Sequence, residues 1–394
     1  MRFISRLYAC FVATVIFVLY FNWVRPSAYI QDNIQRVWNR HAHRVVVFGD
    51  DWSDTGAYRV SPPPKGTTRD RDPHQGKLWT QTLCNELKCD YIDNYARSLP
   101  AKADMNTIGS LINAGILANT TGNANHEKSV LFDFETQVQQ FLKYEKKGLP
   151  AALRQSNHRT VFTVTFGIWD LLAYSSLEQD VGTKAIDRSI AELMRNLDIL
   201  ADHVQGSLQV VVPAVLDVTF LPRFSSRRNE STTMYAVDHH KTVYMWHYWN
   251  GVLSKAAEAW DKGDLYMPDF HNIVIDQVRD HQLYYNQLTD GDGFGTQAPL
   301  FHYVEQPCLS RNVTDLQAPA VEKCSEPTRH LFWDDMHLSG PAHRLIGIEA
   351  ARLVHGNATF NSVAREQALQ RAPPQATHKA RRRIKLSDEA QVSD

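Results

Sequence analysis

Asp51, Asp334 and His337 are the side chains of this 394-residue sequence whose types and spacing could do acid–base or nucleophilic chemistry. Asp334 precedes His337 by three positions. A carboxylate so placed can hold an imidazole in one tautomer while its other nitrogen moves a proton. Asp51 follows the apolar run VVVFG, so a strand should end beside it. As a pair, Asp51 and His337 could attack a glycosidic carbon or activate water.

Four segments resemble, in order, the motifs of the SGNH (GDSL-type) hydrolases: FGDDWSDTG (48–56), NYARSL (94–99), GIWD (167–170) and WDDMH (333–337). The resemblance covers most of residues 44–353. It implies a hydrolase fold of ester-cleaving ancestry, with His337 as the base and Asp334 as its orienting acid. Three positions depart from the family pattern. Asp51 replaces the nucleophilic serine, and Leu99 and Trp169 replace a glycine and an asparagine that donate to the oxyanion.

These departures argue against ordinary serine esterase activity. An ionised carboxylate at Asp51 has no proton to give His337, and its charge would repel a developing oxyanion. Losing one oxyanion donor typically costs on the order of 10² to 10³ in rate. Trp169 offers an indole N–H, but on a side chain whose shape differs from that of a short amide. Leu99 keeps only its backbone N–H. We therefore expect altered chemistry at this site, or none.

Two hypotheses remain. The first is a noncatalytic protein that binds a glycan or an acyl ester; the second is a nonclassical hydrolase or transferase acting through Asp51 and His337. The second requires these side chains within direct or one-water reach at an open pocket. If Trp169 and Leu99 fill that space, a small ligand must use another surface. No cofactor and no metal are expected in either case.

Short β-branched runs alternate with helical patterns from Arg44 onward, which predicts an α/β fold. We expect a three-layer α/β/α domain over residues 44–366, with a mainly parallel sheet of about five strands. The predicted strands are Val45–Phe48, Tyr91–Ile92, Val161–Phe166, Leu208–Val212 and Ile273–Ile275. The predicted helices include Phe134–Tyr144, Lys184–Val204 and Thr232–Trp260.

The termini and cysteines indicate a secretory-pathway protein. Arg2 and Arg6 precede an apolar run at residues 7–24, which predicts a signal anchor within residues 1–28, followed by a linker over 29–43. The alternative is a cleaved signal peptide and secretion. Residues 367–394 are predicted to form a disordered tail.

Four cysteines form two local pairs, Cys84 with Cys89 and Cys308 with Cys324, which suggests two disulfides, although three pairings are possible.

Partners are only partly indicated. Glycosylation sequons begin at Asn119, Asn229, Asn312 and Asn357 and favour a glycoprotein. A formal net charge of −1 gives no electrostatic argument for a nucleic-acid partner. The membrane is an expected partner through the amino-terminal segment, which would make this a single-pass type II protein with its domain in the lumen or outside the cell. Protein partners cannot be named from the sequence.

Overall fold

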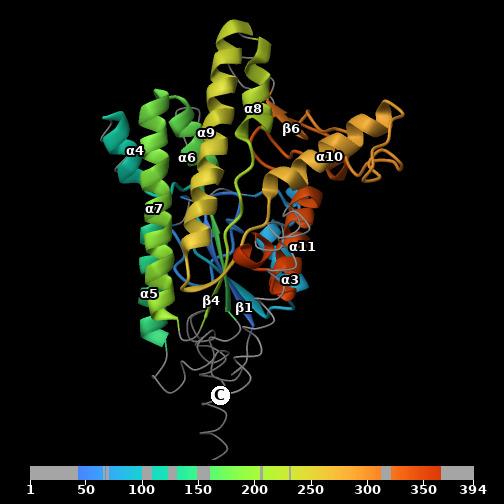
Figure 1. Cartoon of the computed structure of the whole chain (residues 1–394). Helices are drawn as coiled ribbons and strands as arrows, with labels where there is room; N and C mark the ends of the chain where they lie inside the picture. The colour runs from blue at the N-terminus through green and yellow to red at the C-terminus, as the bar shows by residue number, and fades with distance from the viewer. Residues whose placement is uncertain are drawn as a thin grey trace, which may run out of the picture.

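The computed structural model describes residues 43–64, 67, 71–99, 109–122, 131–148, 160–204, 207–229, 232–311 and 321–364. Its central feature is a five-stranded, all-parallel sheet in the order β2-β1-β3-β4-β5 (Figure 1). The strands are β1 Arg44–Gly49, β2 Tyr91–Asn94, β3 Thr160–Thr165, β4 Leu208–Val211 and β5 Gly263–Tyr266. The predicted α/β fold with a parallel sheet of five strands is confirmed.

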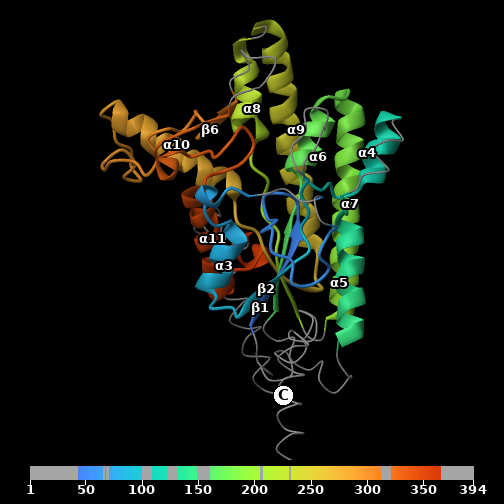
Figure 2. The same ribbon diagram turned by 180° about the vertical axis from the view of Figure 1, so that it is seen from behind.

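Helices cover both faces of this sheet (Figures 1 and 2). Helices α3 (Trp79–Glu86) and α11 (Gly340–His355) pack together on one side, with α10 (Phe270–Tyr285) against α11. On the other side, α7 (Gln179–His203) contacts both its neighbours α5 and α9. The remaining bounds are α4 Ala114–Thr121, α5 Phe134–Gly148, α6 Ile168–Ser175, α8 Pro222–Ser225, α9 Thr232–Ala259, η1 Pro73–Gln75, η4 Val218–Phe220, η5 Ser226–Asn229 and η6 Pro327–Arg329.

The central strands β1 and β3 are the clearest products of the local sequence. Both are rich in β-branched residues, RVVVFG and TVFTVT, and every residue of both is buried. Continuous apolar runs of this kind suit a parallel strand that is covered on both faces. Burying each Val or Phe side chain contributes roughly 1.5–3 kcal/mol. These two strands therefore form the inner part of the core.

One predicted strand is wrong. Residues Ile273–Ile275 belong to α10, and the fifth strand is β5, ten positions earlier. The side chain of Asp269 caps α10 by accepting the backbone N–H of Asn272 at 2.9 Å, which favours a helix at this point. Strand β5 has the sequence GDLY, which contains no β-branched residue. Pairing with β4 creates this strand, and its own residues give little signal.

The direction in which successive strands are added to the sheet reverses between β1 and β3. β1 pairs with β2 on one side and with β3 on the other, and Gly49 lies opposite Thr165 at the carboxyl ends. The N–H of Asp50 donates to the carbonyl of Thr165 at 3.1 Å. In open α/β sheets, functional sites form at such a point of reversal. The segments that follow β1 and β3 therefore begin side by side where a site is expected.

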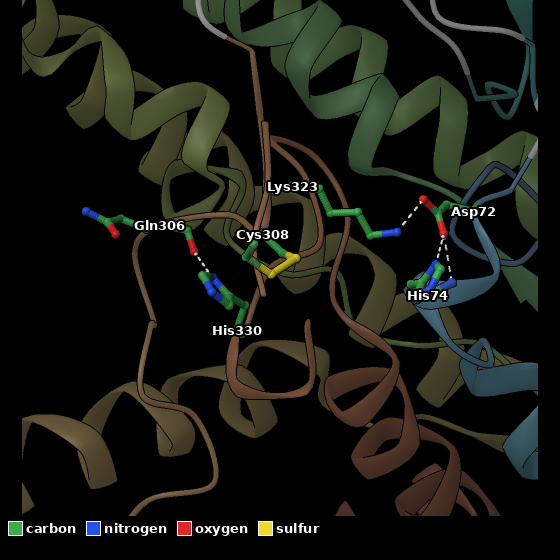
Figure 3. The surroundings of a disulfide bond; sticks show 7 residues. Asp72, His74, Gln306, Cys308, Lys323 and His330 are labelled. Carbon is green, nitrogen blue, oxygen red and sulfur yellow. Dashed lines mark hydrogen bonds and ion pairs between the residues drawn. A yellow bond between two sulfur atoms is a disulfide. The ribbon is translucent and has the colours of Figure 1, made fainter. Parts of the chain in front are cut away.

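Two disulfides join Cys84 to Cys89 and Cys308 to Cys324, as the local pairing suggested. The second closes a small hairpin of β6 (Leu309–Arg311) and β7 (Val321–Lys323). Figure 3 shows Lys323 beside this bond, reaching across to Asp72 at 2.9 Å. Both disulfides are compatible with an oxidising compartment.

The amino-terminal anchor, nearly all of the linker and the carboxyl-terminal tail lie outside the described residues. Among the helices that the structure does describe, none combines the length and the apolar character needed to cross a bilayer.

Candidate functional site

The structure brings Asp51, Asp334 and His337 into one hydrogen-bonded row. The Nε2 atom of His337 lies 2.7 Å from Oδ2 of Asp51, and its Nδ1 atom lies 2.7 Å from Oδ1 of Asp334. The side chains of Asp51, His337 and Asp334 are 0%, 1% and 12% exposed. Two carboxylates therefore hold opposite edges of one imidazole ring, away from solvent.

The orientation of His337 is built into the segment WDDMH. Oδ1 of Asp334 accepts the backbone N–H groups of Met336 and His337 at 2.9 and 2.8 Å. The backbone of Trp333 donates to the carbonyl of His337 at 2.7 Å, which closes the turn. The same carboxylate thus fixes both the backbone and the ring of His337, the orienting role expected for Asp334.

Trp169 holds the second oxygen of Asp51. Its indole Nε1–H donates to Oδ1 of Asp51 at 2.6 Å, and Trp169 is 1% exposed. Trp169 lies in the first turn of α6. This helix begins directly after Gly167, whose φ is 117°. A side chain on Gly167 would also meet Val215 at 2.7 Å. A glycine is therefore needed where the chain turns from β3 into α6, and this turn aims the indole at Asp51.

Gly109 closes the site from another segment, and the sequence analysis did not identify it. A Cβ atom at Gly109 would lie 2.3 Å from Nε1 of Trp169 and 2.5 Å from Oδ1 of Asp51. Gly109 is held there by an antiparallel bridge to Ser98. Leu99, which the resemblance predicts to be an altered oxyanion position, follows this bridge and is half-buried. The backbone at Gly109, together with the ring of Trp169, fills the space beside the Asp51 carboxylate.

Gln137 on α5 is a second residue that the sequence analysis missed. Its side-chain amide makes two hydrogen bonds to Gly49 at the end of β1, accepting from the N–H and donating to the carbonyl, both at 2.9 Å. The same amide donates to the carbonyl of Phe132 at 2.9 Å. Gln137 is fully buried. This amide therefore fixes the backbone two residues before Asp51.

Neighbouring polar residues of the segment 48–56 support the turn. The hydroxyl of Ser53 is buried and accepts the indole N–H of Trp79 at 3.1 Å. Asp54 accepts the side-chain amide of Asn94 at 2.9 Å and the hydroxyl of Ser98 at 2.7 Å. These bonds join the segments FGDDWSDTG and NYARSL into one framework.

Buried carboxyl groups surround the row. Burial raises the pKa of Asp50 well above its usual value, and the charge of Asp51 adds to this. Burial also raises the pKa of Asp170 to about 7, partly offset by the N–H that Ile112 donates to it. In the described part of the chain, Oδ2 of each of these two residues has no hydrogen-bond partner. Burial therefore favours the protonated form of both carboxyl groups.

The arrangement leaves His337 with no free nitrogen. As an imidazolium, His337 donates a hydrogen bond to both carboxylates. As a neutral ring, it donates to one carboxylate and accepts a hydrogen bond from the other, which is then protonated. Neither state offers a lone pair to a substrate hydroxyl or water. The donor N–H of Trp169 is likewise committed to Asp51. In this conformation the row can stabilise the fold but has no group free to start hydrolysis.

Searches against protein-family models and against curated proteins found no match for this chain. Nor does any group of three or more His, Cys, Asp or Glu among the described residues form a metal-binding cluster.

Proposed function

We propose that this chain is a noncatalytic binding protein, built on an SGNH hydrolase-like scaffold, whose ligand is a glycan or an acyl ester. One observation carries the proposal. The carboxylate of Asp51, at the position of the family's nucleophile, is buried with one oxygen bonded to His337 and the other to Trp169. The chain's own side chain thus occupies the base and a hydrogen-bond donor that a substrate would need.

Opening this site for catalysis would be costly. When His337 is protonated, it forms a buried ion pair with Asp51, and withdrawing one partner of such a pair typically costs about 3–5 kcal/mol. The carboxylate of Asp51 would also lose the indole N–H, a hydrogen bond to a charged group worth roughly 1.5–3 kcal/mol. Substrate binding would have to supply this free energy before any bond was broken. The arrangement of Asp51, His337, Asp334 and Trp169, which we call the closed site, is therefore the resting state, and its role is to stabilise the fold.

The proposed location is the secretory pathway, with an anchored domain in the lumen or outside the cell. The two disulfides are compatible with this compartment, because such bonds persist where the environment is oxidising. The apolar run at residues 7–24 supports an anchor from sequence alone.

A hydrolysis assay of the full chain in mild detergent tests the proposal. The substrates are short aryl esters, acetylated sugars and aryl glycosides; the variants are Asp51→Ser, Asp51→Asn and His337→Ala. We expect no turnover by the wild type. Asp51→Ser frees His337 to act as a base, and since general-base assistance contributes on the order of 10² or more, ester cleavage should rise at least about tenfold over the wild-type background.

Asp335→Ser serves as the matched control, because Asp335 is adjacent to Asp334 but its side chain is 58% exposed. It should leave the background rate unchanged. The contrary result is wild-type turnover that is lost in both Asp51→Asn and His337→Ala. That result would establish chemistry through Asp51 and His337 and would refute a noncatalytic function.

A further inference from the structure

A pocket of about 470 Å³ is lined by residues of α6, α8, η5 and the first half of α9. Figure 1 shows α8 and the start of α9 at one end of the molecule. The volume of the pocket falls within the roughly 300–1,000 Å³ that small-molecule sites occupy. The lining residues are Leu172, Ser175, Ser176, Arg223, Phe224, Arg227, Asp238, Lys241 and Thr242. Arg223 connects the pocket to the closed site, since its guanidinium lies 5.8 Å from the ring centre of Trp169.

The pocket carries an excess of positive charge. Three of the lining residues, Arg223, Arg227 and Lys241, are cationic, and Asp238 is the single acidic one. Arg227 bonds to Asp238 at 2.9 Å, and Arg223 lies 3.4 Å from Asp335 outside the lining. No ion pair of Lys241 is found in the part of the chain that the structure describes. An ammonium group so placed attracts an anionic group on a ligand.

The hydroxyl groups of three lining residues already donate to backbone carbonyls. Ser175 donates to the carbonyl of Leu172 at 2.9 Å, and Ser176 donates to that of Ala173 at 2.7 Å. Thr242 donates to the carbonyl of Asp238 at 2.7 Å. With their protons committed, these oxygens can only accept further hydrogen bonds, so a ligand that bonds to them must donate an O–H or an N–H. Ser175 and Ser176 are accessible to such a ligand, whereas Thr242 is 2% exposed. A ligand with several hydroxyl groups supplies such donors.

The lining also offers apolar surface from Leu172, whereas Phe224 is only 4% exposed and contributes little. The C–H face of a sugar ring packs well on such a surface, while its hydroxyls reach the surrounding acceptors. A fatty acid would satisfy the cation but leave the serine oxygens without donors. An inorganic anion would leave the apolar surface uncovered. A ligand with an anionic group, several hydroxyls and an apolar face matches all three features.

We propose that this pocket binds an acidic saccharide, with its carboxylate at Lys241 and its hydroxyls on Ser175 and Ser176. This assignment rests on the proposed binding function and narrows its ligand to a sugar carrying a carboxylate. The bound sugar lies beside the closed site and leaves the row formed by Asp51, His337 and Asp334 intact.

Calorimetric titration of the full chain in mild detergent tests this assignment, with trigalacturonate as the probe. Methyl-esterified trigalacturonate is the matched ligand, because it keeps the hydroxyls and the ring faces but loses the charge. We expect saturable 1:1 binding of the acid and at least about tenfold weaker binding of the ester, as for loss of one charge-assisted hydrogen bond. Lys241→Gln should weaken binding of the acid by a similar factor.

Lys255→Gln is the matched protein control, because Lys255 is an exposed lysine of the same helix that does not line the pocket. It should leave the affinity unchanged. Two results would overturn the assignment: trigalacturonate binding unaffected by Lys241→Gln, or binding of laurate or sulfate without binding of trigalacturonate. Either would leave the noncatalytic function standing, whereas wild-type ester turnover through Asp51 would refute that function whatever the pocket binds.

Discussion

At the scale of single residues, one side chain accounts for the closed site. A serine at position 51 would present a hydroxyl to His337 and leave the indole of Trp169 free. The longer carboxylate reaches both groups, at 2.7 and 2.6 Å. Its charge is compensated by these donors, which is how a buried carboxylate is tolerated. The carboxylate at position 51 thus supplies an internal partner for the residues around it.

Gly109 provides a direct test of this closure. Gly109→Ala would place a Cβ atom 2.3 Å from Nε1 of Trp169 and 2.5 Å from Oδ1 of Asp51, so the neighbouring segments must shift. Overpacking of this kind costs typically about 1–3 kcal/mol. We expect the free energy of unfolding, measured by urea denaturation, to fall by that amount.

The control for this prediction is Gly251→Ala, within α9, where an added Cβ meets no atom within 4 Å. Because alanine favours helix over glycine, it should raise the free energy of unfolding by up to about 1 kcal/mol. Equal stability of Gly109→Ala and the wild type would contradict the close approach of Gly109 to the carboxylate.

At the scale of elements, helix α5 matters because it positions β1. The amide of Gln137 satisfies both backbone groups of Gly49, where β1 gives way to the turn that carries Asp51. This contact joins residues 88 positions apart. A helix that packs on the sheet therefore also determines where the following turn begins.

Gln137→Leu keeps much of the volume of the side chain but removes its amide. The buried N–H of Gly49 would lose the oxygen of Gln137, at roughly 1–3 kcal/mol. Its carbonyl would keep the backbone N–H of Arg97 at 3.1 Å. We expect a clear drop in the midpoint of thermal unfolding. Gln139→Leu, at an exposed position of the same helix, should change stability by no more than about 0.5 kcal/mol. A similar effect of both substitutions would argue against a specific role for Gln137.

At the scale of the whole molecule, the buried carboxyl groups make stability depend on pH. Burial raises the pKa of Asp170 from 3.8 to about 7, so the folded state keeps a proton that the unfolded chain releases near pH 4. This contribution is fully present below pH 4 and is lost as the pH rises through 7. The difference corresponds to roughly 4 kcal/mol. Asp50, whose pKa is also raised, acts with the same sign.

Asp170→Asn should flatten the fall in stability between pH 4 and 7, measured as the urea midpoint at a series of pH values. The asparagine keeps an oxygen for the N–H of Ile112 and has no proton to lose. Comparison with the wild type isolates this group from others, such as His343, whose pKa burial lowers. Asp261→Asn, at an exposed position, should leave the pH profile unchanged. An unaltered profile in Asp170→Asn would mean that Asp170 is ionised in the folded state.

Features encoded in short stretches of chain were predictable from the sequence. The strands β1 and β3, the parallel α/β architecture, the pairing of nearby cysteines and the contact of Asp334 with His337 all follow from periodicity or close spacing. Burial of an apolar run and the reach of a side chain three positions away need little knowledge of the rest of the fold.

Tertiary structure decided whether the site is open. Asp51 meets His337 across 286 positions and Trp169 across 118, and Gly109 and Gln137 complete the closure from other segments. Strand β5 likewise exists because β4 lies beside it. Contacts over such separations depend on how helices and strands pack, so the residue types could name Asp51, His337 and Trp169 but not show that they bind one another.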